Sequence, residues 1–213
     1  MADDYLGRKM EDYRARAAAP ALQRPHVTLG RLLAKNRSCR GYDAAFTVRE
    51  DQLRSIIEVN TMVASTRNRQ ALRFRPVLSD EAAKILPYIH MGGALPELHL
   101  PLAGQEPNAY IVVCSTVAEE FNLGIDLGIA AQSMLLRAVE MGLGGLCIGS
   151  FDRNAIRDVL ALPLPPVLVM AFGRSAEHAE TVEVGAGDAL AYYRRDGVHY
   201  VPKIRVDDLI IGR

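Results

Sequence analysis

The chain has 213 residues and a mass of 23.3 kDa, and 49% of its residues are hydrophobic, which predicts one soluble globular domain over residues 1–213. Twenty-five Lys and Arg residues balance 25 Asp and Glu residues, so the composition provides no electrostatic drive towards nucleic acid or an anionic membrane. The first residues are charged, and no apolar run is long enough to span a bilayer, so we expect a cytoplasmic protein without a signal peptide or membrane span.

The cysteines and histidines predict neither disulfides nor a metal site. Cys39, Cys114 and Cys147 show no pair spacing, and the five histidines show no ligand-like spacing with one another or with the cysteines. We expect three packed thiols, with the arginines beside Cys39 able to lower the pKa of that thiol.

The first third of the chain is predicted to be helical. Residues 3–18 indicate an amphipathic helix within an N-terminal arm, 1–27, and a second helix is expected at 28–35 with Thr28 as its N-cap. Residues 47–50 (TVRE) match a capping box that would open a third helix, which continues to the polar loop 65–70 (STRNRQ).

The middle of the chain mixes strands with one long helix. A strand is expected at 72–78, near a sheet edge or a bulge because of Pro76, and 87–108 is expected to be irregular. Residues 109–115 (AYIVVCS) predict a central strand buried on both faces, and 119–142 predict the longest helix, ended by Gly142.

The remaining segments complete an α+β prediction. A short strand is expected at 146–150 (LCIGS), a helix from the N-cap Asp152, and a strand at 166–172 closed by Gly173, before a tail at 189–213. Strands and helices intermix, so we predict an α+β layered structure with a long buried central helix and no internal repeat.

Residues 36–42 (NRSCRGY) place two arginines and a serine directly after a predicted helix. Guanidinium groups and a hydroxyl suit one phosphomonoester, although arginines at a helix C-terminus also satisfy carbonyl groups and the helix dipole. Lys203 and Arg205 share one face of an extended segment, where they could bind the same anion or simply be solvated.

Other catalytic motifs fit poorly. Residues 142–145 (GLGG) follow a helix and precede a strand, the reverse of the order in a dinucleotide-binding turn. The sequence contains neither a P-loop nor a Gly-x-Ser-x-Gly elbow. Asp126, alone on an apolar helix, is expected to accept structural hydrogen bonds rather than donate a proton.

Taken in order, the motifs resemble the FMN-dependent nitroreductase family. The family's Arg-Arg-Ser-x-Arg element resembles 36–42, its Ser-x-x-Asn-x-Gln loop resembles 65–70, its Gly-Leu-Gly-x-x-x-Ile-Gly element resembles 142–152, and its basic C-terminal segment resembles 202–205. Asn36 replaces a common arginine, and Ala71-Leu72 replaces a frequent Pro-Trp. The resemblance implies a nitroreductase-like fold: a central, mostly antiparallel sheet flanked by helices, with a domain-swapped C-terminal segment.

The resemblance also implies the cofactor contacts. Arg37, Ser38, Lys203 and Arg205 would hold the FMN phosphate, with Asn36 adding a hydrogen bond, and Arg40 would stabilise negative charge at the flavin pyrimidine edge. Residues Ser65, Arg67, Asn68 and Gln70 would contact FMN from the opposite subunit of a homodimer. Residues Cys147, Ile148, Gly149 and Ser150 would run beside the flavin ring, with a backbone N–H near Gly149 donating towards N5.

The implied activity is that of an enzyme: NAD(P)H reduces FMN, and FMN reduces a small electron-poor acceptor such as a nitroaromatic or a quinone in a two-electron ping-pong cycle. Arg40 and Gly149 are the expected catalytic residues, and no metal is expected. Two alternatives stay open: an FMN carrier or sensor of the same fold, and a phosphate-ligand or interaction module without flavin.

Overall fold

The fold comes from a computed structural model that describes residues 7, 9–10, 27–93 and 100–212. The expected arm helix at 3–18 lies almost entirely outside these residues. The helices are α2 (Leu29–Lys35), α3 (Glu50–Glu58), α4 (Ser79–Ile85), α5 (Phe121–Glu140), α6 (Arg153–Val159) and α7 (Val206–Leu209), with 3₁₀ turns η1 (Val59–Thr61), η2 (Thr66–Asn68) and η3 (Leu86–Tyr88). The strands are β1 (Leu72–Val77), β2 (Ala109–Ser115), β3 (Gly144–Ile148), β4 (Pro166–Gly173), β5 (His178–Val184), β6 (Tyr193–Arg195) and β7 (Val198–Ile204).

Four antiparallel strands form the main sheet in the order β1-β2-β4-β3. Every residue of β2 is buried, and Val112 lies opposite Arg75 on one side and Val169 on the other. A strand with no access to water must pair its main-chain groups with strands on both sides, so the apolar run 109–115 correctly predicts a central strand. β1 is an edge strand, as Pro76 predicts.

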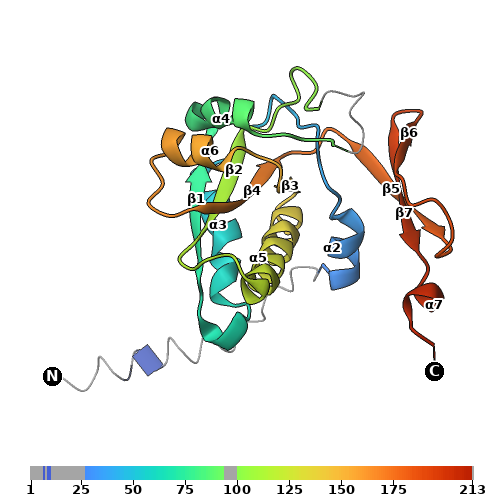
Figure 1. The fold of residues 1–213 in the computed structure, drawn as a ribbon, viewed down its shortest axis with the longest axis horizontal. Coiled ribbons are helices and arrows are strands. Elements are labelled where there is room, and N and C mark those ends of the chain that lie inside the picture. The colour runs from blue at the N-terminus through green and yellow to red at the C-terminus, as the bar shows by residue number, and fades with distance from the viewer. Residues whose placement is uncertain (1–6, 8, 11–26, 94–99, 213) are drawn as a thin grey trace.

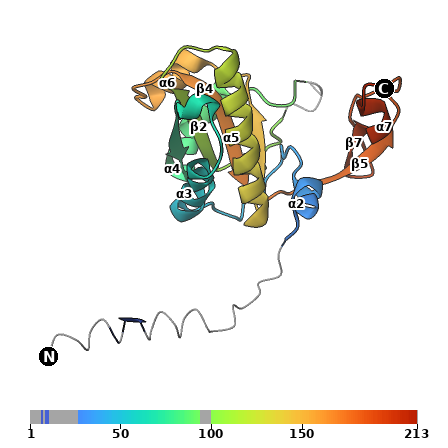
Figure 2. The same cartoon turned by 90° about the horizontal axis from the view of Figure 1, so that it is seen from below.

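Helices cover both faces of this sheet, as Figures 1 and 2 show. On one face α3 and α5 pack against Ile111 and Val113, and on the other α4 and α6 pack against Tyr110 and Val112. The alternation along β2 therefore divides the core between two helical layers. This arrangement confirms the predicted α+β class with its mostly antiparallel sheet.

The long central helix α5 ends in a Schellman motif. The N–H of Leu143 donates to the carbonyl of Ala138 at 2.8 Å, and the N–H of Gly142 donates to the carbonyl of Val139 at 3.0 Å. Gly142 has a φ of +79°, a left-handed conformation in which a Cβ atom is unfavourable. The predicted end of the helix at Gly142 is confirmed.

Local capping predictions have mixed outcomes. Asp152 caps α6, because its Oδ1 accepts the N–H of Ala155 at 3.0 Å. The predicted capping box at 47–50 is wrong: α3 begins at Glu50, and the Gln52 side chain accepts the N–H of Arg49 at 3.0 Å. Val48 is buried and bonded to Asn108, which keeps the preceding residues out of the helix.

The strand β3 is shifted from its predicted position. It spans Gly144–Ile148 rather than 146–150, because the Schellman turn delivers the chain directly to the edge of β4, where Gly144 pairs with Gly173. A Cβ atom at Gly145 would approach Leu135 Cδ2 of α5 to 2.5 Å and Phe172 Cε1 to 3.1 Å, so a larger residue would require these side chains to shift.

A second sheet follows the main one and was not predicted from the sequence. β5 pairs in parallel with β7, and β6 pairs antiparallel with β7 through a turn at Asp196-Gly197. Both turn residues have positive φ, so the Asp-Gly dipeptide was a usable hairpin signal. Figures 1 and 2 show this C-terminal sheet (β5, β6 and β7) standing away from the main sheet, with α2 between the two.

Several apolar side chains lie on the surface of the chain. α2 begins after the N-cap Thr28, as predicted, but buries none of its residues, and Leu29 is 61% exposed. Phe121 at the start of α5 is 83% exposed, and Ile211 near the C-terminus is 96% exposed. Among the described residues, no helix is long and apolar enough to cross a membrane.

We expect Gly142→Ala to lower the free energy of unfolding by about 1 kcal/mol, because an L-residue is strained at this φ. No atom lies within 4 Å of the position a Cβ would take, so the loss comes from the backbone rather than from a clash. Urea unfolding measures the effect. Gly142→Asn is the control and should lose less, because asparagine tolerates this conformation; equal stability of Gly142→Ala and the wild type would contradict the account.

Candidate functional site

Residues 36–42 are fixed in an extended path beside β3. Ser38 forms a parallel bridge with Gly145, and the N–H of Cys39 donates to the Gly145 carbonyl at 3.1 Å. The fully buried Tyr42 donates its hydroxyl to the carbonyl of Cys39 at 2.8 Å. The segment therefore extends the main sheet at its β3 edge, and its polar side chains are held in place by backbone pairing.

A cavity of about 350 Å³ lies between this segment, α5 and the C-terminal sheet. It brings Lys203 of β7 to the same space as the basic segment, although the two are far apart in sequence. The predicted residues that line it are Asn36, Arg37, Ser38, Arg40 and Lys203, and the further lining residues are Leu33, Gln132, Leu135, Tyr192, His199 and Val201. The structure thus brings Lys203, but not Arg205, to the cavity of the basic segment.

Arg37 has one of the two roles that its sequence position allows, because it satisfies a carbonyl at the end of α2. Its Nη2 donates to the carbonyl of Leu33 in the last turn of α2, at 2.5 Å. Its Nε is buried and has no hydrogen-bond partner within the described part of the chain. A buried N–H without a partner is unfavourable for stability, and other atoms of Arg37 line the cavity.

Arg40 is linked to the C-terminal sheet through Glu177. The backbone N–H of Arg40 donates to Glu177 Oε2 at 2.6 Å, while Oε1 of the same carboxylate pairs with Arg194 of β6. The Arg40 guanidinium lies 5.4 Å from the centre of the Tyr192 ring, a cation–π distance. Glu177 therefore connects the basic segment to the second sheet and leaves the Arg40 guanidinium near the cavity.

Tyr192, His199 and Gln132 line the cavity but were not identified from the sequence. His199 is 6% exposed, its Nδ1 has no partner within the described residues, and its ring meets Tyr192 edge-on at 5.1 Å. Burial, followed by the charges of Arg194 and Arg40, lowers the pKa of His199. A lone histidine in a tail carries no local signal for such burial.

Arg205 lies next to this cavity rather than in it. It lines a neighbouring cavity of about 420 Å³ that also contains Leu33, Arg37 and Lys203. Its Nε donates to Asp208 Oδ2 at 2.8 Å, an ion pair within the first turn of α7. Arg37 and Lys203 line both cavities, so Arg205 shares the second cavity with them.

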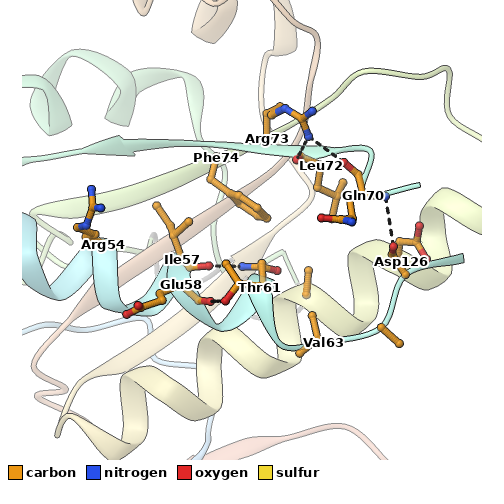
Figure 3. Close-up of a pocket in the computed structure, with 14 residues that line it drawn as sticks. Arg54, Ile57, Glu58, Thr61, Val63, Gln70, Leu72, Arg73, Phe74 and Asp126 are labelled. Atoms are coloured by element: carbon orange, nitrogen blue, oxygen red, sulfur yellow. Dashed lines mark hydrogen bonds between the residues drawn. The ribbon is translucent and has the colours of Figure 1, made fainter. Parts of the chain in front are cut away.

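The loop 65–70 lies away from the basic cavity. Ser65 and Gln70 line a separate cavity of about 580 Å³ between α3, β1 and the start of α5 (Figure 3). Arg67 and Asn68 are exposed on the same loop. Within one chain the structure therefore does not bring these four predicted residues to Arg37 and Lys203.

The segment 147–150 also lies outside the basic cavity. Ile148 is buried against the core, whereas Gly149 is exposed, with no atom within 4 Å of the position a Cβ would take. No neighbour within the described chain requires a glycine there. The carbonyl of Ser150 accepts the N–H of His90, which ties this end of β3 to the irregular stretch.

The cysteine predictions need correction. Burial raises the pKa of Cys39, and this effect outweighs the expected influence of neighbouring arginines; the charge of Glu177 acts in the same direction. Cys147 is exposed rather than packed, yet the surrounding protein raises the pKa of its thiol to about 11. Both groups are thiols at neutral pH, so neither is an activated nucleophile.

Asp126 accepts hydrogen bonds, as expected from its place on an apolar helix. Its Oδ1 accepts the N–H of Thr66 at 2.6 Å and the Thr66 hydroxyl at 2.8 Å. The carboxylate is 3% exposed and lies beside the cavity lined by Ser65 and Gln70.

Comparison with known proteins assigns the chain to a family. The family model described as Nitroreductase family matches residues 33–174, which include the basic segment, the 65–70 loop and the whole main sheet. The chain belongs to the nitroreductase family. The resemblance carried by residues 36–42, 65–70 and 142–152 is thereby confirmed.

Solved structures of nitroreductases share the fold. An FMN-dependent nitroreductase from Clostridium difficile R20291 aligns with a TM-score of 0.57 and 21% identity, over 70% of this chain and 88% of that chain. A Staphylococcus epidermidis protein, whose name proposes NAD(P)H:FMN oxidoreductase activity, aligns with a TM-score of 0.56 and 17% identity, over 71% and 89%. A Methanocaldococcus jannaschii relative, whose name proposes a nitroreductase, is 38% identical over 53 residues, which covers 25% of this chain and 27% of that protein.

We expect this nitroreductase-family chain to become less stable as the pH is lowered, because His199 is harder to protonate in the folded state. Because the folded state lowers the pKa of His199 below 6.5, the unfolded chain binds the proton more readily. The free energy of unfolding should therefore fall as pH drops below about 6.5 and should carry no such loss above it. The groups facing the ring are Arg40, Arg194, Glu177 and Tyr192.

Urea unfolding at pH 7.5 and pH 5.5 measures this effect. His199→Gln should lose less stability between the two pH values than the wild type does. His178→Gln, at an exposed position, is the matched control and should follow the wild type. An identical loss in His199→Gln and the wild type would show that His199 is not responsible.

Proposed function

We propose that this protein is an FMN-dependent oxidoreductase that takes electrons from NAD(P)H. The observation that supports this proposal most strongly is the convergence of Arg37, Ser38, Arg40 and Lys203 on one cavity. Three cations and a hydroxyl around a small space, in a chain with no net charge, suit one compact anionic group rather than a polyanion. The names of the C. difficile and S. epidermidis relatives indicate FMN as that group.

The residues present fit the phosphate end of FMN. Arg37 offers a guanidinium group that lines the cavity, Ser38 offers a hydroxyl, and Lys203 offers an ammonium group from the facing sheet. These are the charge-assisted donors that a phosphomonoester accepts. Leu33 and Leu135 provide the apolar part of the same wall.

Arg40 is proposed to hold a fixed positive charge at the redox end. Its backbone is held by Glu177 and its guanidinium lies at the Tyr192 ring. A preorganised charge stabilises negative charge that develops nearby without further reorganisation. Gly149 has an open approach on its exposed side, which is compatible with a backbone donor to the flavin edge.

When bound, FMN would accept a hydride from NAD(P)H and transfer two electrons to an electron-poor acceptor such as a nitroaromatic or a quinone. The protein's own residues bind, orient and tune the cofactor. No side chain is required as a general base, so the raised pKa values of Cys39 and Cys147 are compatible with this function.

We also propose that the protein works as a homodimer with FMN at the subunit interface. The support is the apolar surface that one chain leaves uncovered: Leu29 of α2, Phe121 of α5, Met62, and Ile211 near the C-terminus are each more than half exposed. A second copy would cover this surface, and residues Ser65, Arg67, Asn68 and Gln70 would then contact the partner's flavin. Light scattering after gel filtration tests the assembly, and a monomer at micromolar concentration would contradict it.

Reconstitution tests the activity directly. The purified chain should bind added FMN and quench its fluorescence, and anaerobic NADH or NADPH should bleach the flavin absorbance. Restoration of the absorbance by a nitroaromatic or a quinone would complete the cycle. Binding without bleaching would instead indicate an FMN carrier or sensor, and no binding would exclude both flavin functions.

We expect Arg37→Ala and Lys203→Ala each to weaken FMN binding by about 10- to 100-fold, because each removes a charge-assisted hydrogen bond to the phosphate. The measurement is fluorescence titration with FMN and with riboflavin, which lacks the phosphate. Both variants should lose affinity for FMN much more than for riboflavin. Lys35→Ala, a cation on α2 outside the cavity, is the control and should bind like the wild type; equal losses for both flavins would contradict the phosphate assignment.

We expect Arg40→Ala to slow flavin reduction by NAD(P)H at least tenfold while changing the FMN dissociation constant less than Arg37→Ala does. Stopped-flow absorbance with FMN at saturation gives the rate. A normal reduction rate together with lost FMN binding would place Arg40 at the phosphate instead.

A further inference from the structure

Asp126 is a buried carboxylate in which only one of the two oxygens accepts hydrogen bonds from the described residues. It lies in the second turn of α5, among the apolar residues Leu123 and Ala130, and is 3% exposed. One oxygen, Oδ1, accepts both the N–H and the hydroxyl of Thr66, while Oδ2 is buried and has no partner within the described residues. Both of its hydrogen bonds therefore go to one residue of the 65–70 loop.

The loop that Asp126 holds has an unusual backbone. Arg67, Asn68 and Gln70 have φ values of 53°, 53° and 48°, which L-residues rarely adopt. Such conformations persist only where surrounding contacts enforce them. Inside the loop, the N–H of Gln70 donates to Ser65 Oγ at 3.2 Å and Gln70 Nε2 donates to Asn68 Oδ1 at 3.0 Å.

The contacts that connect this loop to α5 are few. Arg69 pairs with Glu120 at 2.5 Å, but both side chains are about one-third or more exposed, so water and salt screen the pair. The Thr66 bonds to Asp126 are less accessible to water, because they end on a carboxylate that is 3% exposed. Figure 3 shows Asp126 beside the cavity wall, close to Gln70.

We propose that Asp126 is a positioning residue that holds Ser65, Asn68 and Gln70 in the conformation that binds FMN. This inference rests on the proposed function, because it takes the loop to be a flavin contact. Asp126 itself touches neither cofactor nor substrate in this account. It acts through Thr66, which starts the strained turn η2.

The unpaired Oδ2 of Asp126 separates the proposed positioning role from a contribution to the stability of the whole fold. A buried carboxylate with an unpaired oxygen is unfavourable for stability, and an apolar side chain of similar size would be tolerated at least as well by the core. Replacement of Asp126 should therefore affect the loop more than it affects the global fold. Loss of loop order and loss of stability can then be separated experimentally.

The test compares wild type, Thr66→Ser, Thr66→Val, Asp126→Asn and Asp126→Leu as full-length proteins. Thr66→Ser keeps both donors to Asp126, whereas Thr66→Val removes the hydroxyl, so these two variants form a matched pair. We expect FMN binding within about twofold of wild type for Thr66→Ser, weakened about 3- to 10-fold for Thr66→Val, and weakened at least tenfold for Asp126→Leu. Asp126→Asn, which keeps an acceptor oxygen, should lie between wild type and Asp126→Leu.

A second readout requires no flavin. Trypsin should cleave after Arg67 and Arg69 faster in Thr66→Val and Asp126→Leu than in wild type or Thr66→Ser. Cleavage after Arg195, the last residue of β6, is the internal control and should not change. The urea midpoints of the apo-proteins should show no loss that parallels the loss of FMN affinity.

The outcomes separate this inference from the proposed function. Wild-type affinity and wild-type cleavage in both Thr66→Val and Asp126→Leu would overturn the positioning role. If Asp126→Leu fails to fold, Thr66→Val against Thr66→Ser decides the same question. If the wild type binds no FMN, the proposed function fails, and with it the flavin role of Asp126, whatever the trypsin experiment shows of the loop.

Discussion

The main-chain pairing of β2 and β4 is the constraint on which the rest of the fold depends. Both strands are almost wholly buried, so each must find partners for its N–H and carbonyl groups within the sheet. β2 and β4 pair with each other, β2 also pairs with β1, and β4 also pairs with β3. β3 then presents an unpaired edge, and the segment 36–42 pairs with it through Gly145. The location of the basic segment thus follows from the hydrogen-bonding demand of the core.

Charge is balanced over the whole molecule but not among the residues that line the basic cavity. Arg37, Arg40 and Lys203 line the cavity. Glu177 forms an ion pair with Arg194 and accepts a hydrogen bond from the backbone N–H of Arg40. The guanidinium groups of Arg37 and Arg40 have no carboxylate partner among the ion pairs of the described residues. A neutral protein can therefore hold one small site with strong positive potential.

Helix α5 connects the two sites. Gln132 and Leu135 line the basic cavity, whereas Asp126 and Ala130 line the cavity beside the 65–70 loop. The helix is rigid because its buried face packs into the core around Met134 and Ala138. In the proposed homodimer, two copies of this helix would set the geometry between the loop of one chain and the basic cavity of the other.

The sequence by itself determined the elements whose signals are local. The apolar run 109–115, the periodicity of 119–142, Gly142, Asp152 and Pro76 each predict a feature that the structure contains. The motif order also predicts the family. These signals work because strand burial, helix amphipathicity and capping depend on neighbours within a few residues.

Only the tertiary structure decided which distant residues meet. It placed Lys203 beside Arg37, buried His199 against Tyr192, joined Asp126 to Thr66 and left Arg205 paired with Asp208. It also corrected the start of α3, the limits of β3 and the direction of the pKa shift at Cys39. Strand register and burial are set by packing between segments far apart in the chain, and local sequence carries no record of that packing.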